Sequence, residues 1–168
     1  MTVVLYAALA LITLDQATKH WVHSRFALGD GFSVIPGFFD IRYVQNTGAA
    51  WGILQGMGAL LIVLSIGMLI LLLFGHRHLL EDRPSHRMIQ VLLVGGIVGN
   101  LVDRVRLGYV VDFLYFYWGE HDFPAFNIAD SAICVGVFLY LLSQYSGRKL
   151  SGEAVVREPE PAVAGNQP

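Results

Sequence analysis

The sequence predicts an α-helical integral membrane protein with four transmembrane helices. Of its 168 residues, 55% are hydrophobic and only 14% are charged, whereas a soluble domain carries about 25% charged residues. The mean hydropathy is +0.56. Apolar stretches recur along the chain, and each is close to the length of about 20 residues that a helix needs to cross a bilayer. The predicted spans are 2–22, 57–74, 87–105 and 127–145.

The first span holds an acid and a base among apolar residues. Asp15 and Lys19 lie four residues apart and therefore share one helix face. They form either a simple ion pair, with Lys19 extending outward to the membrane surface, or part of a functional site. The triplet "ALA" at 8–10 weakly resembles a signal-peptide cleavage site. No Lys or Arg precedes the apolar run, which continues past the triplet, so a retained membrane helix is favoured.

The other spans differ in where their polar residues lie. The second span is apolar throughout, and the fourth begins with "FNIAD". The third ends in "GGIVGNLVDR", in which Gly95 and Gly99 form a GxxxG pattern that lets helices approach closely. Asn100 and Arg104 follow on one face, and a carboxylate elsewhere in the chain is the natural partner of Arg104.

The distribution of basic residues predicts the orientation in the membrane, because short cytoplasmic loops are enriched in Lys and Arg. The bias favours cytoplasmic termini, with segments 23–56 and 106–126 outside. The residues on the inner side are Arg77, Arg83, Arg87, Arg148, Lys149 and Arg157; those on the outer side are Arg25, Arg42, Arg104 and Arg106.

The two outer segments have the composition of strands. Residues 32–46 and 109–118 are rich in aromatic and β-branched side chains, and Pro36 and Gly37 indicate a turn. An interfacial aromatic belt would have the same composition. The tail, 150–168, is rich in Pro, Glu and Ala and is expected to be disordered, which leaves 1–149 as the membrane domain.

Several classes of function are disfavoured by composition. The net charge of −2 offers no basis for binding nucleic acid. The single cysteine, Cys134, cannot form a disulfide framework or a thiolate metal site. The six histidines show no ligand-type spacing, so no metal or cofactor is expected.

Two acids are predicted at the outer face of the membrane. Asp112 follows the third span and Asp130 begins the fourth, 18 residues later. Two close carboxyls share a proton, so one can accept a proton from water while the other donates one to a carbonyl. Alternatively, Asp130 lies in the first turn of a helix that Asn127 caps, and Asp112 pairs with Arg104 or Arg106. Ser131 has no neighbouring histidine in the sequence to activate it as a nucleophile.

The order of five motifs resembles the lipoprotein signal peptidase family, bacterial signal peptidase II. These motifs lie within about residues 10–145, which is most of the chain, and together they are highly specific. They are "DQATK" in the first span, "NTGAAWG" at 46–52, "GNLVDR" at 99–104, "VVDF" at 110–113 and "FNIAD" at 126–130.

The resemblance implies an aspartic endopeptidase of the bacterial inner membrane that cleaves diacylglyceryl-modified prolipoproteins before the lipidated cysteine. It implies a small periplasmic β-cradle, a short periplasmic helix, an active site towards the periplasm, and inhibition by globomycin. The catalytic pair would be Asp112 and Asp130. The supporting or substrate-binding residues would be Asn46, Gly48, Asn100, Arg104, Asn127, Asp15 and Lys19. A monomer in contact with membrane lipid is expected.

Two rival interpretations remain open at this level. Intramembrane Asp and Asn also suit a proton-coupled transporter. The polar groups, however, cluster near one membrane face instead of lining a path across the bilayer. A structural membrane subunit without chemistry would leave Asp112 and Asp130 unexplained together.

Overall fold

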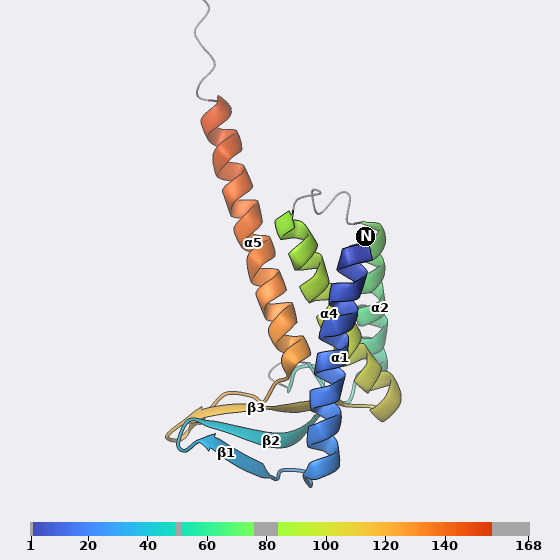
Figure 1. Ribbon diagram of the computed structural model, residues 1–168, viewed down its shortest axis with the longest axis vertical. Helices are drawn as coiled ribbons and strands as arrows, with labels where there is room; N and C mark the ends of the chain where they lie inside the picture. The colour runs from blue at the N-terminus through green and yellow to red at the C-terminus, as the bar shows by residue number, and fades with distance from the viewer. Residues whose placement is uncertain (1, 50–51, 76–83, 156–168) are drawn as a thin grey trace, which may run out of the picture.

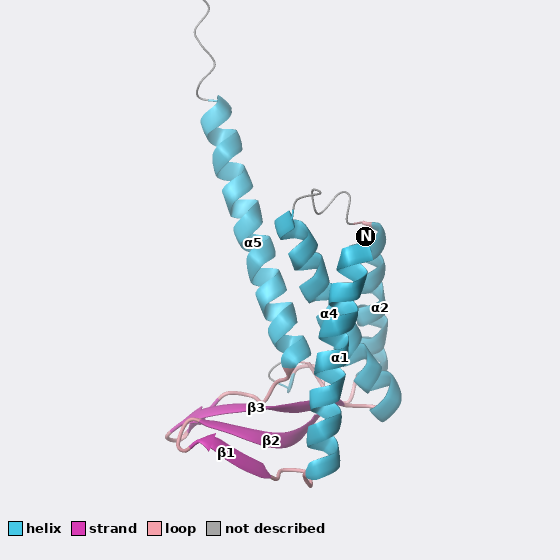
Figure 2. Ribbon diagram, viewed as in Figure 1, coloured by secondary structure: helices cyan, strands magenta, loops and turns pink. Residues whose placement is uncertain are grey.

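The protein consists of a helical bundle with a small sheet across one end. The computed structural model describes residues 2–49, 52–75 and 84–155 (Figure 1). The start of α1 and the end of α5 both lie at the end of the bundle away from the sheet, and helix and strand are segregated along the long axis (Figure 2). The helices are α1 (Thr2–Arg25), α2 (Gly58–Phe74), α4 (Pro84–Leu107) and α5 (Ile128–Val155).

The two outer segments form an antiparallel sheet in the order β1-β2-β3-β4, which confirms the predicted strands. Its strands are β1 (Gly31–Ile35), β2 (Phe39–Asn46), β3 (Val110–Trp118) and β4 (His121–Asp122). Pro36 and Gly37 make the predicted turn between β1 and β2, where Gly37 has a φ of 80° that glycine adopts readily. An irregularity in β2 between Ile41 and Val44 sets Val44 opposite Asp112.

Small residues let α4 lie close to both α1 and α5. A Cβ at Gly95 would stand 2.6 Å from the Leu11 side chain, and one at Gly99 would stand 2.7 Å from Oδ2 of Asp15. A Cβ at Gly96 would likewise stand 2.5 Å from the carbonyl oxygen of Ala129. The predicted close approach at the glycine pattern is confirmed, and it brings polar side chains of three helices together.

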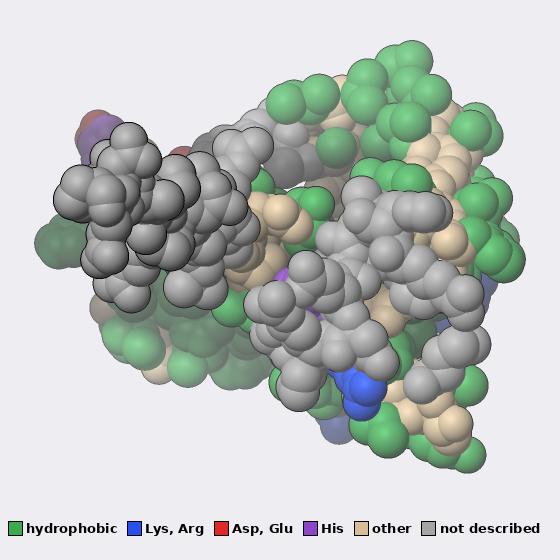
Figure 3. All heavy atoms as spheres, turned by 90° about the horizontal axis from the view of Figure 1, so that it is seen from above, with side chains coloured by type: hydrophobic (Ala, Val, Ile, Leu, Met, Phe, Trp, Pro, Cys, Tyr) green, Lys and Arg blue, Asp and Glu red, His purple; other side chains and the backbone are tan. Residues whose placement is uncertain are grey.

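The helices have the character of membrane spans to different degrees. In the described part of the chain, His86–Leu107 and Ile128–Tyr145 are long and apolar enough to cross a membrane, and Gly58–Phe74 is apolar but has 17 residues. Side chains such as Val63 and Phe138, each 64% exposed, point away from the bundle. Seen from the end away from the sheet, hydrophobic side chains dominate the visible rim (Figure 3). Such a surface suits contact with lipid chains.

A buried apolar cluster joins the sheet to the lower end of α1. It consists of Val22, Tyr43, Val111 and Phe113, and none of these side chains is more than 5% exposed. By packing beside this cluster, the first residues of β3 are held against the helices. This contact positions the strand that carries Asp112.

The last helix is longer than the sequence composition predicted. The tail was expected to be disordered from residue 150, but α5 continues through Val155. Residues 148–155 include the good helix formers Arg, Lys, Leu, Glu and Ala, and the first proline of the tail comes only at Pro159. The described residues do not include 50 and 51 of the outer segment 23–56, or the tail from 156.

Candidate active site

Two amide side chains connect Asp112 of β3 with Asp130 of α5. Asn127 Nδ2 donates to Asp112 Oδ1 at 2.7 Å and to Asn100 Oδ1 at 3.2 Å. Asn100 Nδ2 in turn donates to Asp130 Oδ1 at 2.7 Å. The two aspartates therefore lie at opposite ends of one hydrogen-bonded chain.

Asn127 also begins α5, as its place in the sequence predicted. Its Oδ1 accepts a hydrogen bond from the Asp130 backbone N–H at 2.9 Å, and Asp130 Oδ2 accepts one from the Asn127 backbone N–H at 3.3 Å. This reciprocal pair satisfies amide groups that a helix start leaves unpaired. The capping interpretation of "FNIAD" is therefore confirmed, and the same geometry directs the other oxygen of Asp130 towards Asn100.

Asp112 is buried, with 2% of its surface exposed, and amides hold both of its oxygens. Besides Asn127, Asn46 Nδ2 donates to Asp112 Oδ2 at 2.9 Å. Asn46 is itself oriented by the backbone N–H of Gly48, which donates to Asn46 Oδ1 at 2.9 Å. The glycine is required here, because a Cβ at this position would meet the carbonyl of Ile53 at 2.8 Å.

The environment of Asp112 favours its protonated form. Burial, with a smaller contribution from the negative charge of Asp130, raises the pKa of Asp112 to about 7. The hydrogen bonds from Asn46 and Asn127 and the charge of Lys19 act in the opposite direction on this pKa. A carboxyl that titrates near neutral pH can exchange protons with a substrate under ordinary conditions.

Asp15 and Lys19 form the expected pair, deep inside the bundle. Lys19 Nζ lies 2.9 Å from Asp15 Oδ2, and the side chains are 2% and 1% exposed, respectively. The ammonium group also donates to Asn100 Oδ1 at 2.9 Å. The alternative in which Lys19 extends to the membrane surface is therefore wrong, and the pair belongs to the polar network that holds the two aspartates.

Arg104 contacts the site through a backbone carbonyl. Its guanidinium donates to the Gly48 carbonyl at 3.0 Å, and within the described residues it forms no ion pair with a carboxylate. The prediction that Arg104 pairs with a carboxylate, Asp112 included, is therefore wrong. The amides of Asn46 and Asn127 already donate to the two oxygens of Asp112. Arg104 instead holds the loop that follows β2 next to α4 through this hydrogen bond.

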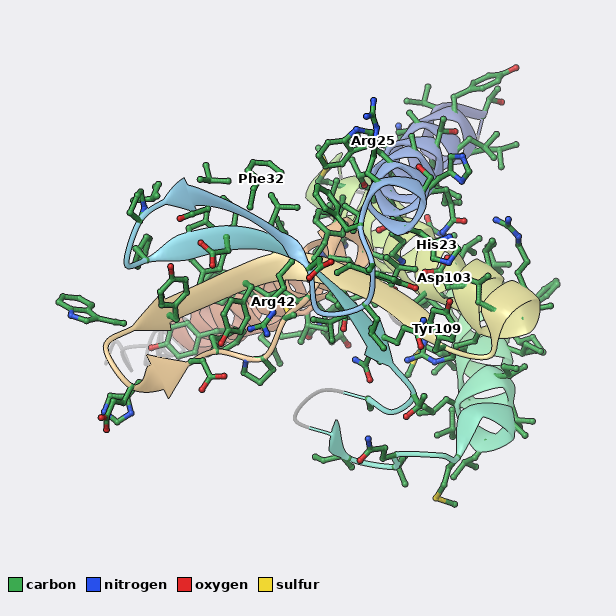
Figure 4. The ribbon with its side chains drawn as sticks, turned by 90° about the horizontal axis from the view of Figure 1, so that it is seen from below. His23, Arg25, Phe32, Arg42, Asp103 and Tyr109 are labelled. Atoms are coloured by element: carbon green, nitrogen blue, oxygen red, sulfur yellow. The ribbon has the colours of Figure 1, made fainter. Side chains whose placement is uncertain are left out.

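Two residues of this network, Gln16 and Asp103, were not among the site residues predicted from the sequence. Asp103 accepts a hydrogen bond from Gln16 at 3.0 Å and from the Val111 backbone N–H at 3.0 Å. Figure 4 shows Asp103 near the end of α4, in the region of Tyr109. The spacing held a clue, since Asp103 follows Asn100 by three residues, and Lys19 follows Gln16 by three, so each pair shares a helix face.

The hydroxyl of Ser131 is used within the helix. Its Oγ donates to the Asn127 carbonyl at 2.9 Å, which agrees with the structural role expected for it. The chemistry that the arrangement offers is proton transfer by two carboxyls, of which Asp112 is buried and Asp130 is partly buried. Every residue predicted for the site, Asp15 and Lys19 included, joins this network or contacts it.

The sequence is similar to known proteins over most of its length. A family model described as signal peptidase (SPase) II matches residues 7–146. A lipoprotein signal peptidase of Syntrophotalea carbinolica is 42% identical over 147 residues, which cover 85% of this chain and 91% of that protein. A lipoprotein signal peptidase of Bacillus pumilus is 38% identical over 150 residues, covering 88% and 95%.

The fold is similar to two solved bacterial membrane enzymes determined by the in meso method. The first has a TM-score of 0.78 and 32% identity, and the match covers 97% of this chain and 96% of that one. The second has a TM-score of 0.75 and 35% identity, with coverage of 86% and 93%. The similarity thus extends to the bundle and the sheet together.

Proposed function

The chain belongs to the signal peptidase II family of membrane aspartic peptidases, and from this we propose that Asp112 and Asp130 cleave the signal peptide from diacylglyceryl-modified prolipoproteins. The scissile bond is the one before the lipidated cysteine. The single observation that carries the catalytic assignment is the hydrogen-bonded chain from Asp112 through Asn127 and Asn100 to Asp130.

The reaction needs one carboxyl ionised and the other protonated. The ionised carboxylate takes a proton from water while the water oxygen attacks the carbonyl carbon of the scissile bond. The protonated carboxyl gives its proton to the carbonyl oxygen, so a neutral tetrahedral diol forms. As the diol collapses, the second carboxylate takes back a proton from one diol hydroxyl, the C–N bond breaks, and the amine leaves with the proton that the first carboxyl received. The pKa of Asp112 near 7, raised by burial and by the charge of Asp130, supports a pair that shares one proton at neutral pH.

The remaining site residues would bind substrate or support the pair. Asn46 and Asn127 hold Asp112, while Asn100 holds Asp130. Gly48 and Arg104 keep the loop after β2 next to the site, where an extended substrate backbone would pass. Asp15 and Lys19 support Asn100 and the start of α5.

We further propose four membrane spans in the inner membrane, with cytoplasmic termini and the sheet in the periplasm. The sheet lies at one end of the bundle, and the start of α1 and the end of α5 lie at the other, which agrees with the distribution of Lys and Arg (Figure 1). In a Cys134→Ser background, a membrane-impermeant maleimide added outside intact spheroplasts should label Ser33→Cys and leave Ser85→Cys unlabelled. The reverse pattern would invert the orientation. A monomer is proposed because all of the proposed site residues come from one chain.

The experiment that tests the function is a gel-shift assay with purified protein. A diacylglyceryl prolipoprotein should shift to the size of the mature lipoprotein plus a free signal peptide. Globomycin should suppress the shift. A substrate that stays intact with folded enzyme, or cleavage at a bond other than the one before the modified cysteine, would contradict the proposal.

A further inference from the structure

The residue before each proposed catalytic aspartate is held by a buried carboxylate from a different element. The Val111 backbone N–H, next to Asp112, donates to Asp103 Oδ2 of α4 at 3.0 Å. The Ala129 backbone N–H, next to Asp130, donates to Asp15 Oδ1 of α1 at 2.9 Å. Amide groups in the first turn of a helix have no partner inside the helix. Asp15 therefore accepts a hydrogen bond that α5 cannot satisfy by itself.

One ammonium group joins these two carboxylates. Lys19 Nζ lies 2.9 Å from Asp15 Oδ2 and 3.3 Å from Asp103 Oδ2, and the side chain is 2% exposed. Its third contact is Asn100 Oδ1 at 2.9 Å. An ammonium group has three N–H donors, and these three contacts account for all of them.

The contact with Asn100 decides which way that amide points. Asn100 Oδ1 accepts from Lys19 and from Asn127, so its Nδ2 is left to face Asp130 at 2.7 Å. If the amide were reversed, its NH₂ group would face the ammonium of Lys19 and its oxygen would face the carboxyl oxygen. The cation therefore selects the orientation in which Asn100 stabilises Asp130 as a carboxylate.

We propose that Lys19 is a positioning residue of the peptidase. Through Asp103 and Asp15 it sets the separation of Asp112 and Asp130. Through Asn100 it determines how these two aspartates share a proton. The inference rests on the proposed catalytic roles of the two aspartates. Lys19 contacts two supporting carboxylates: Asp103, which holds β3, and Asp15, which holds α5. Its ammonium group contacts both supports and the amide that faces Asp130.

The charged and titratable groups around Lys19 come from four elements. Asp15 lies on its own helix, Asp103 on α4, Asp112 on β3 and Asp130 on α5. Its positive charge lowers the pKa of Asp112, which burial and Asp130 raise. Removing this charge should therefore raise the pKa of Asp112 and shift the alkaline limb of the cleavage rate to higher pH.

The direct test replaces the ammonium with a neutral side chain of similar length. We expect Lys19→Met to lower kcat by on the order of 10²-fold, because small displacements of catalytic groups have effects of this size. KM for the lipidated precursor should change much less. The alkaline limb of the pH profile should move upwards. Lys19→Arg, which keeps the charge, should keep the limb near its wild-type position.

A charge-balanced variant covers the case in which Lys19→Met does not fold, since that change leaves Asp15 and Asp103 without their cation. Asp15→Asn combined with Lys19→Met removes one charge of each sign and keeps an oxygen for the Ala129 N–H. It should fold in detergent and show the same loss of kcat and the same upward shift. Wild-type kcat and pH profile in this folded variant would overturn the proposal.

Two comparisons separate this proposal from its alternatives. Ile89→Ala removes a buried apolar side chain, 1% exposed and eleven residues from Asn100, and should lower the melting temperature without moving the pH profile. An equal shift with Ile89→Ala would mean that the profile reports stability alone. If Asp112→Asn and Asp130→Asn retain cleavage, the catalytic assignment fails; if they are inactive and the Lys19 variants are normal, only the positioning role fails.

Discussion

Asp112→Asn and Asp130→Asn should each reduce cleavage of a lipidated prolipoprotein by about 10³-fold or more. General acid–base catalysis by one positioned group contributes about 10²–10⁴-fold, and the proposed pair needs both members to move protons. An asparagine can still hydrogen-bond to its neighbours but can neither take a proton from water nor deliver one. Initial rates from the gel-shift assay with purified variants would measure the loss.

Folding of these variants must be checked independently, and the raised pKa of Asp112 provides the check. Burial, with the charge of Asp130, raises this pKa to about 7 in the folded state, whereas the ordinary value is 3.8. Between these values the unfolded chain ionises while the folded protein stays protonated, so stability falls as pH rises and levels off above pH 7. The full effect is on the order of 4 kcal/mol at 1.36 kcal/mol per unit.

Asp112→Asn removes this ionisation but loses one of two hydrogen-bond acceptors, since Asn46 and Asn127 donate to both oxygens. The melting temperature of the variant relative to wild type should therefore rise between pH 5 and pH 8. A matched control is Asp122→Asn, which should keep wild-type cleavage. Asp122 is an exposed carboxylate on the sheet that accepts a hydrogen bond from Tyr115. Substantial cleavage by folded Asp112→Asn or Asp130→Asn would refute the catalytic pair.

An unlipidated precursor should be cleaved at least about 100-fold more slowly than the diacylglyceryl form. Asp130 lies in the first turn of α5 and Asp112 in the strand below it, so the proposed catalytic groups sit at the end of the membrane helices. Two acyl chains on the adjacent cysteine would hold the scissile bond at this depth, and misplacement by about 1 Å can lower a rate 100-fold.

The comparison should use one precursor before and after diacylglyceryl transfer, in the same detergent micelles and with kcat and KM measured separately. A precursor with Ser in place of the modified cysteine controls for the thiol. If depth is what matters, kcat should fall for both unlipidated forms. Equal rates for lipidated and unlipidated precursors would refute positioning by the lipid and leave the catalytic pair untouched.

The sequence predicted most of the local structure, and the reasons are local. Apolar runs of membrane length predicted helices at the right places, and the aromatic, β-branched segments with Pro36 and Gly37 between them predicted the sheet. Asn127 as the cap with Asp130 three residues later follows from the chemistry of helix starts. Each of these features depends on residues within a few positions of one another.

Other features were missed or predicted differently because they depend on distant contacts. Lys19 was given an exposed alternative, since its burial is decided by Asp103 and Asn100 on another helix. Arg104 was assigned a carboxylate partner, yet the carbonyl of Gly48 on a loop 56 residues away receives its hydrogen bond. The extension of α5 to Val155 was missed because composition was weighed above helix propensity.

The sequence by itself determined the membrane class, the places of helices and strands, and which polar residues stand out among apolar ones. The tertiary structure decided that these residues meet. Ala129 and Asp15 are 114 positions apart, and Asn100 and Asp130 are 30 apart. Such contacts exist because Gly99 lets α1, α4 and α5 pack closely enough for short side chains to touch, and this depends on three helices at once. No pattern of neighbouring residues in the sequence encodes how closely these three helices approach one another.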